Sequence, residues 1–349
     1  MRQLVTERTV RELVPIEGAD KIELAKVDGW QCVVKKGEFE VGEKAIYFEI
    51  DSMIPADDKR FSFLSKGKKV DRYRIKSMKL RGALSQGLLI PMSNLTNEER
   101  MRIFDGETPT EVLRVEKYEP VIPMGGKQKG TFPTHLVPKT DQERIQNIAG
   151  ILELHDSSQF EITEKLDGTS CTMWMFVTQD DIGVLDIDVQ NPEDIERWKR
   201  ETSGVASRNW EMQVDDENIY ARMFKENDMA SKLWDLGRNL AIQGEIIGPS
   251  IQGNKYKLDK ATFFVFDIYD IDAKGYLNPD ARQALAQELG LNHVPVLDIE
   301  VPFTLQGVLD AADGRSQLHD TAREGLVFKS YQDGVSFKAI SNKWLLKNE

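Results

Sequence analysis

The sequence contains little cysteine and no long apolar run. Its two cysteines, Cys32 and Cys171, lie far apart and form neither a disulfide framework nor a zinc-binding pattern. No stretch approaches the ~18 consecutive apolar residues of a membrane-spanning helix. The N-terminal segment MRQLVTERTVRELVP also lacks the apolar core of a secretory signal. We therefore exclude a membrane-spanning protein and a disulfide scaffold, and we expect a reducing, cytoplasmic environment.

The composition is otherwise that of a globular protein with a real core. Hydrophobic residues make up 40% of the chain and charged residues 30%. At ~150 residues per domain, a length of 349 residues predicts two or three domains.

Charge is distributed unevenly along the chain. The net charge is −12, but residues 1–125 hold 22 basic and 21 acidic side chains, whereas the remainder holds 24 and 37. The two parts therefore carry +1 and −13. Within the first part, residues 59–81 contain ten basic side chains and one acidic side chain. A local surface of this kind can bind phosphate groups even in an acidic protein.

The first part of the chain reads mainly as short strands separated by turn residues. We predict strands over 31–34, 45–50, 73–80 and 87–91, followed by a helix over 96–102 with Thr96 as its N-cap. Short strands at this spacing are typical of a small barrel such as the OB fold.

A segment rich in proline and glycine, 118–138, has no regular hydrophobic period and is predicted to link two domains. Thr140 or Asp141 should then cap a helix that ends near Gly150. Seven acidic and no basic residues in 180–196 indicate a solvated insertion. The second domain should mix strands over 159–164, 170–177, 241–246, 261–268, 325–329 and 335–339 with helices over 218–237 and 280–289.

The clearest chemical pattern is Lys165-Leu166-Asp167-Gly168, which places a lysine beside a turn at the end of an alternating strand. Alone, this pattern is equally typical of a β-turn with an exposed lysine. Five further blocks follow in order, at 207–209, 243–254, 263–268, 324–329 and 337–343.

This ordered series resembles the covalent nucleotidyltransferases, which include DNA ligases, RNA ligases and mRNA capping enzymes. The blocks GEIIGPSIQG and FKAISNK are similar to those of the RNA ligase 2 branch, and the front half resembles the subfamily with an N-terminal OB domain. The resemblance implies an α+β fold. An OB-like β-barrel would occupy residues 1–117 and a linker 118–138. A nucleotidyltransferase domain of antiparallel sheets with flanking helices would occupy 139–349.

The resemblance also implies roles for individual residues. Lys165 would attack the α-phosphorus of ATP and become lysyl-AMP, with neighbouring cations such as Lys338 and a bound Mg²⁺ or Mn²⁺ lowering its pKa. Asp167 and Gly168 would form the turn, and Gly168 would let the backbone approach the nucleotide. Glu245 and Glu324 would lie near the metal and the ribose.

Further residues would bind the nucleotide. Glu164 would accept a hydrogen bond from the adenine amino group, and Arg208 would reach the ribose or the α-phosphate. Alternation places Phe264, Phe266 and Ile268 on one face of a strand, and either phenylalanine can stack on the purine; the family motif favours Phe264.

Two lysines near the end of the chain complete the expected set. Lys338 and Lys329 would neutralise phosphate charge. Ile340 stands where related enzymes often carry a second lysine, so Lys343 is the alternative source of that charge.

Within the basic run, Lys66, Lys68, Lys69, Arg72 and Arg74 would contact nucleic acid, with aromatic neighbours for stacking. The predicted enzyme is a monomeric, ATP-dependent RNA ligase that seals nicks in duplexes with RNA on the 3′-OH side, and we expect no protein partner. A DNA ligase, a capping enzyme and a non-catalytic RNA-binding protein remain the alternatives. The four histidines show no metal-ligand spacing.

Overall fold

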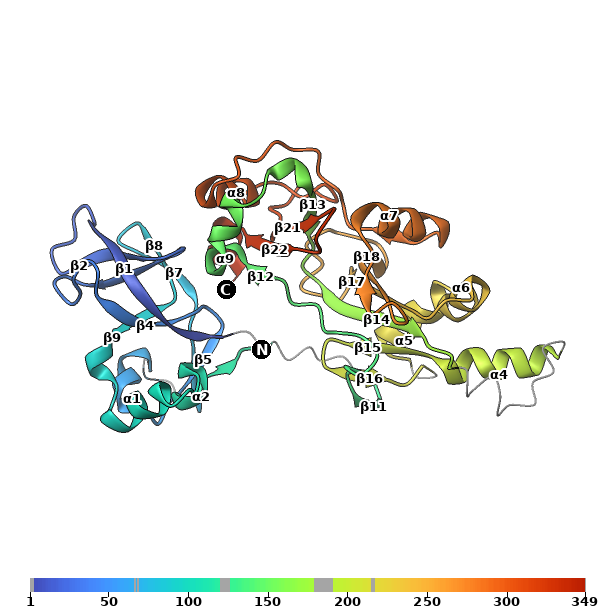
Figure 1. The fold of residues 1–349 in the computed structure, drawn as a ribbon, viewed down its shortest axis with the longest axis horizontal. Helices are drawn as coiled ribbons and strands as arrows, with labels where there is room; N and C mark the ends of the chain where they lie inside the picture. The colour runs from blue at the N-terminus through green and yellow to red at the C-terminus, as the bar shows by residue number, and fades with distance from the viewer. Residues whose placement is uncertain are drawn as a thin grey trace. The chain divides into compact units, whose positions relative to one another are not determined.

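The computed structural model describes residues 3–65, 67, 69–119, 126–178, 191–214 and 217–348. These residues divide into two units, which we treat separately (Figure 1). Unit 1 comprises Met1–Val121, Glu143–Glu153 and Asn342–Glu349, and unit 2 comprises Ile122–Gln142 and Leu154–Ser341. Residues 143–153 and the C-terminal helix therefore group with the N-terminal part, although the sequence placed them in the second domain. The limits expected for the linker stay a prediction.

Unit 1 is the predicted OB fold. Its main sheet has the strand order β3-β2-β1-β4-β9, and it is accompanied by the small sheet β10-β5-β6 and the hairpin β7-β8. Burial alternates along β2 and β3, so that one face of the main sheet forms the core. The long strand β1 pairs with β2 and β4 and contains a bulge between Val10 and Glu12, which bends the sheet. The strands are β1 (Val5–Pro15), β2 (Ile22–Val27), β3 (Trp30–Lys35), β4 (Lys44–Phe48), β5 (Ser52–Pro55), β6 (Arg72–Arg74), β7 (Ser77–Leu80), β8 (Ala83–Gln86), β9 (Leu88–Pro91) and β10 (Glu116–Lys117).

Three helical elements of unit 1 begin with a side-chain cap, supplied by Asp58, Thr96 and Thr108. Thr96 is the N-cap of α1, as the sequence predicted, and it forms a capping box with Glu99. The helical elements are η1 (Lys59–Leu64), η2 (Met92–Asn94), α1 (Asn97–Phe104), α2 (Pro109–Val112), η3 (Ile145–Asn147), η4 (Ala149–Glu153) and α9 (Asn342–Asn348).

The helix expected from Asp141 to Gly150 is wrong. Residues 143–153 instead form the short strand β12 (Glu143–Arg144) and the 3₁₀ turns η3 and η4. Asn147 accepts hydrogen bonds from Arg8 at 2.9 Å and from the indole of Trp30 at 2.8 Å. These tertiary contacts override the weak helical preference of the segment.

Unit 2 contains two sheets. The large sheet has the order β11-β16-β15-β14-β17-β18-β19, with β20 parallel to β18, and β13, β21 and β22 lie side by side in the small sheet. Its strands are β11 (Gln128–Thr131), β13 (Phe160–Lys165), β14 (Thr169–Met175), β15 (Ser203–Ser207), β16 (Trp210–Met212), β17 (Leu240–Ile247), β18 (Thr262–Asp270), β19 (Gly275–Tyr276), β20 (Asn292–His293), β21 (Gly325–Ser330) and β22 (Ser336–Ile340).

Helices cover one face of the large sheet, and an extended segment packs on the other. Buried side chains of α5, α6 and α7 share one core with Met173, Ile242 and Val265. On the opposite face, Phe132 and Val137 pack against Trp174 and other buried residues. The helical elements are η5 (Ser157–Gln159), α4 (Pro192–Thr202), α5 (Ile219–Glu226), α6 (Met229–Leu236), α7 (Pro279–Glu288) and α8 (Leu305–Ala312).

Two sequence predictions for unit 2 need correction or qualification. The single helix predicted over 218–237 is broken into α5 and α6 at Asp228, whose φ of 51° is left-handed and cannot continue a helix. Most of the acidic insertion, residues 179–190, lies outside the described residues.

A β-bulge in β18 also changes the expected alternation. Gly244 pairs with Val265 and Gln243 with Asp267, so Phe266 is the extra residue. Ile268 therefore packs in the core with Phe263 and Val265, whereas the sequence placed it on the face of Phe264 and Phe266.

Both cysteines are buried free thiols, Cys32 in unit 1 and Cys171 in unit 2, and burial raises the pKa of each. Among the helices in the described part of the chain, none is long and apolar enough to cross a membrane.

Candidate active site

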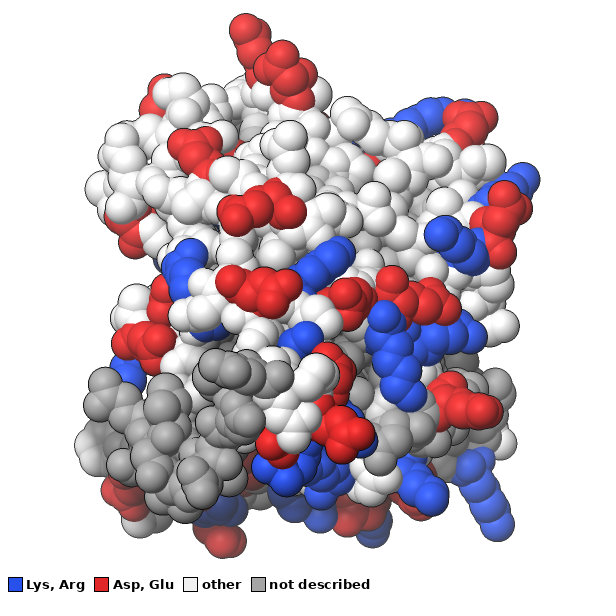
Figure 2. Space-filling model, turned by 90° about the vertical axis from the view of Figure 1, so that its right-hand side faces the viewer, with Lys and Arg blue, Asp and Glu red and all other residues white. Residues whose placement is uncertain are grey.

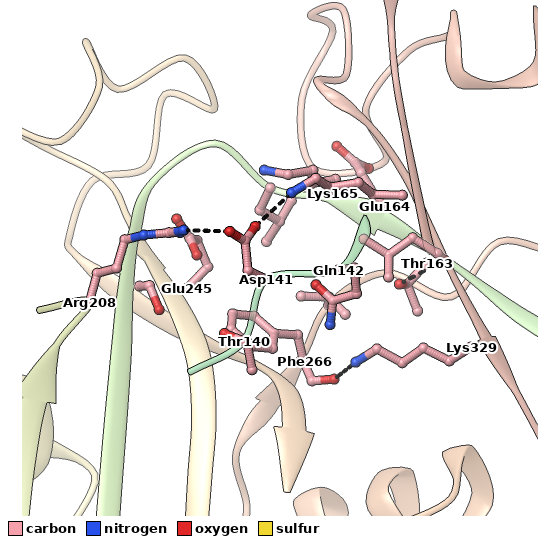
Figure 3. Close-up of a pocket in the computed structure, with 15 residues that line it drawn as sticks. Thr140, Asp141, Gln142, Thr163, Glu164, Lys165, Arg208, Glu245, Phe266 and Lys329 are labelled. Carbon is pink, nitrogen blue, oxygen red and sulfur yellow. Dashed lines mark hydrogen bonds and ion pairs between the residues drawn. The ribbon is translucent and has the colours of Figure 1, made fainter. Parts of the chain in front are cut away.

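A pocket in unit 2 brings together most of the predicted site residues (Figure 3). It is lined by both sheets and by the extended segment before residue 143. The lining residues are Thr140, Asp141, Gln142, Thr163, Glu164, Lys165, Leu166, Ser170, Arg208, Glu245, Phe266, Val294, Val327, Lys329 and Lys338.

The register of the small sheet explains why three lysines reach this pocket. Thr163 pairs with Val327, which pairs in turn with Lys338, and Lys165 and Lys329 lie two residues from them on the same face. The opposite face is apolar, with the rings of Phe328 and Phe337 stacked at 4.7 Å. Burial of that aromatic face fixes the sheet and leaves the charged face toward the pocket.

Lys165 is the last residue of β13, and its ammonium group is held by a carboxylate. Its Nζ donates to both oxygens of Glu324 at 2.7 Å. Glu324 precedes β21, whose Gly325 pairs with Lys165. Glu324 itself is buried and is not one of the lining residues.

The charge balance around Lys165 differs from the sequence expectation. Burial alone would lower the pKa of Lys165, but the carboxylates of Glu324, Glu245 and Asp167 outweigh it, and the pKa is raised above its ordinary value. The expected lowering by a neighbouring cation such as Lys338 is therefore wrong, and the lowering assigned to a bound metal stays a prediction. The raised pKa favours the ammonium form of the Lys165 side chain.

Glu245 and Glu324 both have raised pKa values. Burial raises the pKa of Glu245 to about 8, and Lys165 only partly opposes this effect. Burial also raises the pKa of Glu324, again opposed by Lys165. These two carboxylates and Asp167 surround one ammonium group and supply the oxygen ligands that Mg²⁺ and Mn²⁺ prefer. Within the residues that the structure describes, no three His, Cys, Asp or Glu side chains are already grouped to hold a metal ion.

Asp167 and Gly168 form the turn after Lys165 but do not line the pocket. Asp167 forms an ion pair with Lys255, and its backbone N–H donates to the hydroxyl of Tyr256 at 2.8 Å. A Cβ on Gly168 would meet the carbonyl oxygen of Ile246 at 2.3 Å. Glycine is thus required here for close packing on β17, whereas the sequence argument invoked approach to the nucleotide.

Glu164 is buried, and only one of its carboxylate oxygens has a partner. Oε2 accepts a hydrogen bond from the backbone N–H of Gln317 at 2.8 Å, whereas Oε1 is buried and has no hydrogen-bond partner. Burial raises the pKa of this carboxyl, with Ser316 and Gln317 opposing. A ligand that donates a hydrogen bond would satisfy the unpaired oxygen.

Phe266 lines the pocket, and Phe264 does not. Phe264 pairs directly with Glu245 and is buried beside Leu166, Ile247 and Tyr256. The bulge turns the half-buried Phe266 toward the pocket instead. Phe266 is consequently the ring that can stack on a base, and Phe264 serves the core.

Lys329 is held at the pocket wall by a buried network. Its Nζ donates to Asp267 at 2.6 Å and to the backbone carbonyl of Phe266 (Figure 3). Arg282 lies 3.6 Å from Asp267 and forms a second buried ion pair with Glu161. Burial lowers the pKa of Lys329, with Asp267 opposing and Arg282 adding to the effect.

Lys338 and Arg208 converge on one carboxylate. Asp141 accepts from Lys338 Nζ at 2.9 Å. It also accepts from Arg208 at 3.2 Å (Figure 3). Ile340 is buried in β22, so it leaves no room for a second cation there. Lys343 is exposed on α9 in unit 1 and is not a lining residue, and its role stays a prediction.

The predicted nucleic-acid residues of unit 1 fall into three groups. Lys66 and Lys68 lie outside the described residues, and Lys69 is exposed. Arg72 pairs with Glu116 at 2.5 Å. Arg74 pairs with Asp51 at 2.6 Å and lies 3.7 Å from the ring centre of Tyr118. Both arginines therefore bind within unit 1, whereas Lys79 and Arg81 of the β7-β8 hairpin are exposed.

Figure 2 shows the face that carries the helices of unit 2. Among the described residues in view, much of the upper part is uncharged, and most basic side chains lie in the lower half, mixed with acidic ones.

The sequence analysis did not identify several residues of the site. Asp141 was assigned only a capping role, and Lys255 and Tyr256 directly follow a block that was singled out. Their contacts with Lys338 and with the Asp167 turn depend on tertiary structure, which no local spacing reports.

Comparison with known proteins gives two family matches and a set of structural matches. A family model described as an OB-fold domain matches residues 4–92, and a model described as RNA ligase matches residues 158–340. Among curated proteins, none matches the chain.

Solved structures of an RNA ligase from Naegleria gruberi are similar to the whole chain. A lysine-to-alanine variant with ATP and Mn is 41% identical, with a TM-score of 0.85, over 99% of this chain and 100% of that one. The same ligase with PPi is 42% identical, with a TM-score of 0.85, over 99% and 98%. A lysine-to-methionine variant with AMP and Mn is 41% identical, with a TM-score of 0.85, over 100% of both chains.

Proposed function

The chain belongs to the RNA ligase family, and on that premise we propose that it joins a 3′-OH RNA end to a 5′-phosphate end with ATP. Lys165 attacks the α-phosphorus of ATP, forms lysyl-AMP and releases pyrophosphate. AMP then passes to the RNA 5′-phosphate, and the 3′-OH attacks that activated end and releases AMP. The observation that carries the assignment is a half-buried lysine, Lys165, whose Nζ lies 2.7 Å from Glu324 in a pocket with three further cations.

The first step requires a neutral amine at Lys165. The surrounding carboxylates hold its proton, so these carboxylates must lose their influence before Lys165 can attack. Glu324 and Glu245, with Asp167, are the residues that would hold a divalent metal. A bound Mg²⁺ or Mn²⁺ would neutralise phosphate charge and compete with the ammonium for these oxygens. Glu324 thus serves Lys165 as a proton-retaining partner before nucleotide binds.

Nucleotide selection is assigned to Glu164 and Phe266. The unpaired Oε1 of Glu164 suits the adenine amino group, which is a donor, whereas guanine presents a carbonyl acceptor at that position. Phe266 lies on the pocket wall where a purine ring can stack. Because Glu164 needs a hydrogen-bond donor on the base, the pocket favours ATP over GTP, which argues against a capping enzyme.

Neutralisation of the phosphate charge is assigned to Arg208, Lys329 and Lys338. All three line the pocket with Lys165 and come from three different strands or their ends. Cations held in place by carboxylate partners stabilise developing charge with little reorganisation during the reaction. The presence of this set argues against a non-catalytic RNA-binding protein.

The RNA substrate is proposed to be a nicked duplex, gripped through unit 1 by a monomer. Lys66, Lys68 and Lys69 remain candidates for phosphate contact, and exposed Lys79 and Arg81 join them, whereas Arg72 and Arg74 stabilise the fold. We place the reaction inside the cell, where reducing conditions keep Cys32 and Cys171 as thiols.

Covalent labelling with [α-³²P]ATP tests the proposal. Wild-type protein should retain label on a denaturing gel, whereas Lys165→Ala and Lys165→Arg should retain none, since arginine is never the neutral amine. Lys257→Ala, an exposed lysine outside the pocket lining, is the control. Label on Lys165→Ala at the wild-type level would reject the nucleophile. Equal sealing of an all-DNA 3′-OH strand would favour a DNA ligase.

A further inference from the structure

The carboxylate of Asp141 links two cations that come from different sheets. Arg208 follows β15 of the large sheet, and Lys338 lies within β22 of the small sheet. Asp141 accepts from Arg208 through one oxygen at 3.2 Å (Figure 3). Its other oxygen accepts from Lys338 at 2.9 Å. A carboxylate therefore lies at the point where both cations meet.

The backbone around Asp141 is fixed by other contacts. Gln243 donates to the carbonyl oxygen of Pro138 at 3.0 Å, and Lys139 donates to Asn209 at 2.9 Å. On the other side, Gln142 lies 3.4 Å from Asp267. The segment is thus attached to the large sheet before and after Asp141 by contacts that do not involve the Asp141 carboxylate.

We propose that Asp141 is a resident counter-ion of the phosphate subsite, which holds Arg208 and Lys338 before nucleotide binds and yields them to the α-phosphate. This inference rests on the proposed function, which assigns both cations to the nucleotide. Carboxylate and phosphate oxygens are bound by the same N–H donors at similar distances. The two anions therefore compete for one pair of partners.

Two physical consequences follow from this competition. In the absence of nucleotide, Asp141 offsets the repulsion between Arg208 and Lys338 and keeps their side chains oriented toward the pocket. When nucleotide binds, the negative charge of Asp141 opposes the phosphates and weakens their binding. Asp141 is therefore a positioning residue that lowers nucleotide affinity, and this distinguishes it from a residue that only orients the cations.

Binding of α,β-methylene-ATP, whose α–β bridge resists cleavage, tests the proposal by calorimetry on the full-length protein at a fixed Mg²⁺ concentration. Asp141→Asn keeps the shape and an acceptor oxygen but removes the charge. It should bind the analogue at least fivefold more tightly, and the gain should shrink as salt is added. Adenosine, which has no phosphate, should bind wild type and variant equally.

A matched control and a folding check accompany this measurement. Asp333→Asn removes an acidic charge at the β21–β22 turn, outside the pocket lining, and should leave the affinity for the analogue unchanged. Thermal melting shows whether Asp141→Asn is folded, and Asp141→Ser provides a second uncharged side chain if it is not.

Unchanged or weaker binding of the analogue by folded Asp141→Asn or Asp141→Ser would overturn the proposal, because the carboxylate would then not compete. The same gain in Asp333→Asn would also overturn it, since the effect would be one of overall charge. Labelling of the wild type by ATP tests the proposed function separately. If the wild-type protein binds the analogue but does not form lysyl-AMP from ATP, the proposed function is wrong. The binding of the analogue by wild type and variant can still be compared.

Discussion

Gly168→Ala adds a single methyl group at the turn behind Lys165. The new Cβ would lie 2.3 Å from the carbonyl oxygen of Ile246, 2.6 Å from Cγ2 of Ile247 and 3.0 Å from Cγ of Glu245. Ordinary van der Waals contacts of a Cβ begin at 3.4 Å. The turn must therefore move by ~1 Å away from β17, which carries Glu245.

This displacement sets the expected magnitude. Crowding of a well-packed site costs about 1–3 kcal/mol of unfolding free energy. A shift of ~1 Å in a reacting group lowers the rate by ~10²-fold, because attack requires near-ideal alignment. We expect the Gly168→Ala protein to fold, to unfold at a lower urea concentration and to form lysyl-AMP ~10²-fold more slowly.

The assay is the initial rate of labelling at saturating [α-³²P]ATP, measured beside urea unfolding. Gly275→Ala is the matched control, since the nearest atom to its new Cβ is the carbonyl oxygen of Ala273 at 3.9 Å. It should change the unfolding free energy by no more than about 0.5 kcal/mol and leave labelling intact. A Gly168→Ala protein with wild-type labelling and stability would refute the argument, because the turn would then have room for a side chain.

Three further outcomes are expected. Glu324→Gln removes the carboxylate that most raises the pKa of Lys165, so the rising limb of the pH–rate profile should move to lower pH. The labelling rate should also fall ~10²-fold, because a candidate metal ligand is lost. A rising limb at the wild-type pH would contradict this expectation. Phe266→Leu should weaken ATP binding by about 1–3 kcal/mol with little loss of stability, as measured by calorimetry. Phe264→Leu should mainly lower the stability of the protein, as measured by thermal melting. Joint replacement of Lys69, Lys79 and Arg81 by Ala should weaken binding to nicked RNA and reduce its salt slope by ~0.7–0.9 per lost contact. Replacement of Arg72 and Arg74 should instead lower the melting temperature, and the reverse pattern would move the RNA contact to those arginines.

The sequence predicted the fold class and most strands because short β-prone runs are bounded by turn residues. The strand before Lys165 and the capping box at Thr96 are local features, and the structure contains both. The helix predicted from Asp141 failed because Asn147 hydrogen-bonds to Arg8 and Trp30, which are more than a hundred residues away. Such contacts leave no trace in local spacing.

The sequence predicted most of the residues of the candidate site but not the electrostatic effects among them. Lys165, Glu245, Lys329 and Lys338 were all named from the ordered blocks, and the pocket includes them. The choice between Phe264 and Phe266 depended on a bulge, which a strict alternation of two cannot represent. The sign of the pKa shift at Lys165 depends on which charges lie nearest in space. The sequence does not show that the carboxylate of Glu324 contacts Lys165 directly.

The two buried thiols give the chain an internal pair of reporters. Cys32 and Cys171 are the only cysteines, one lies in each unit, and both are inaccessible in the folded state. An alkylating reagent can therefore reach either thiol only after the surrounding core has opened. Mass spectrometry of pulse-alkylated protein would read the opening of each unit separately, in a single sample and without any engineered label.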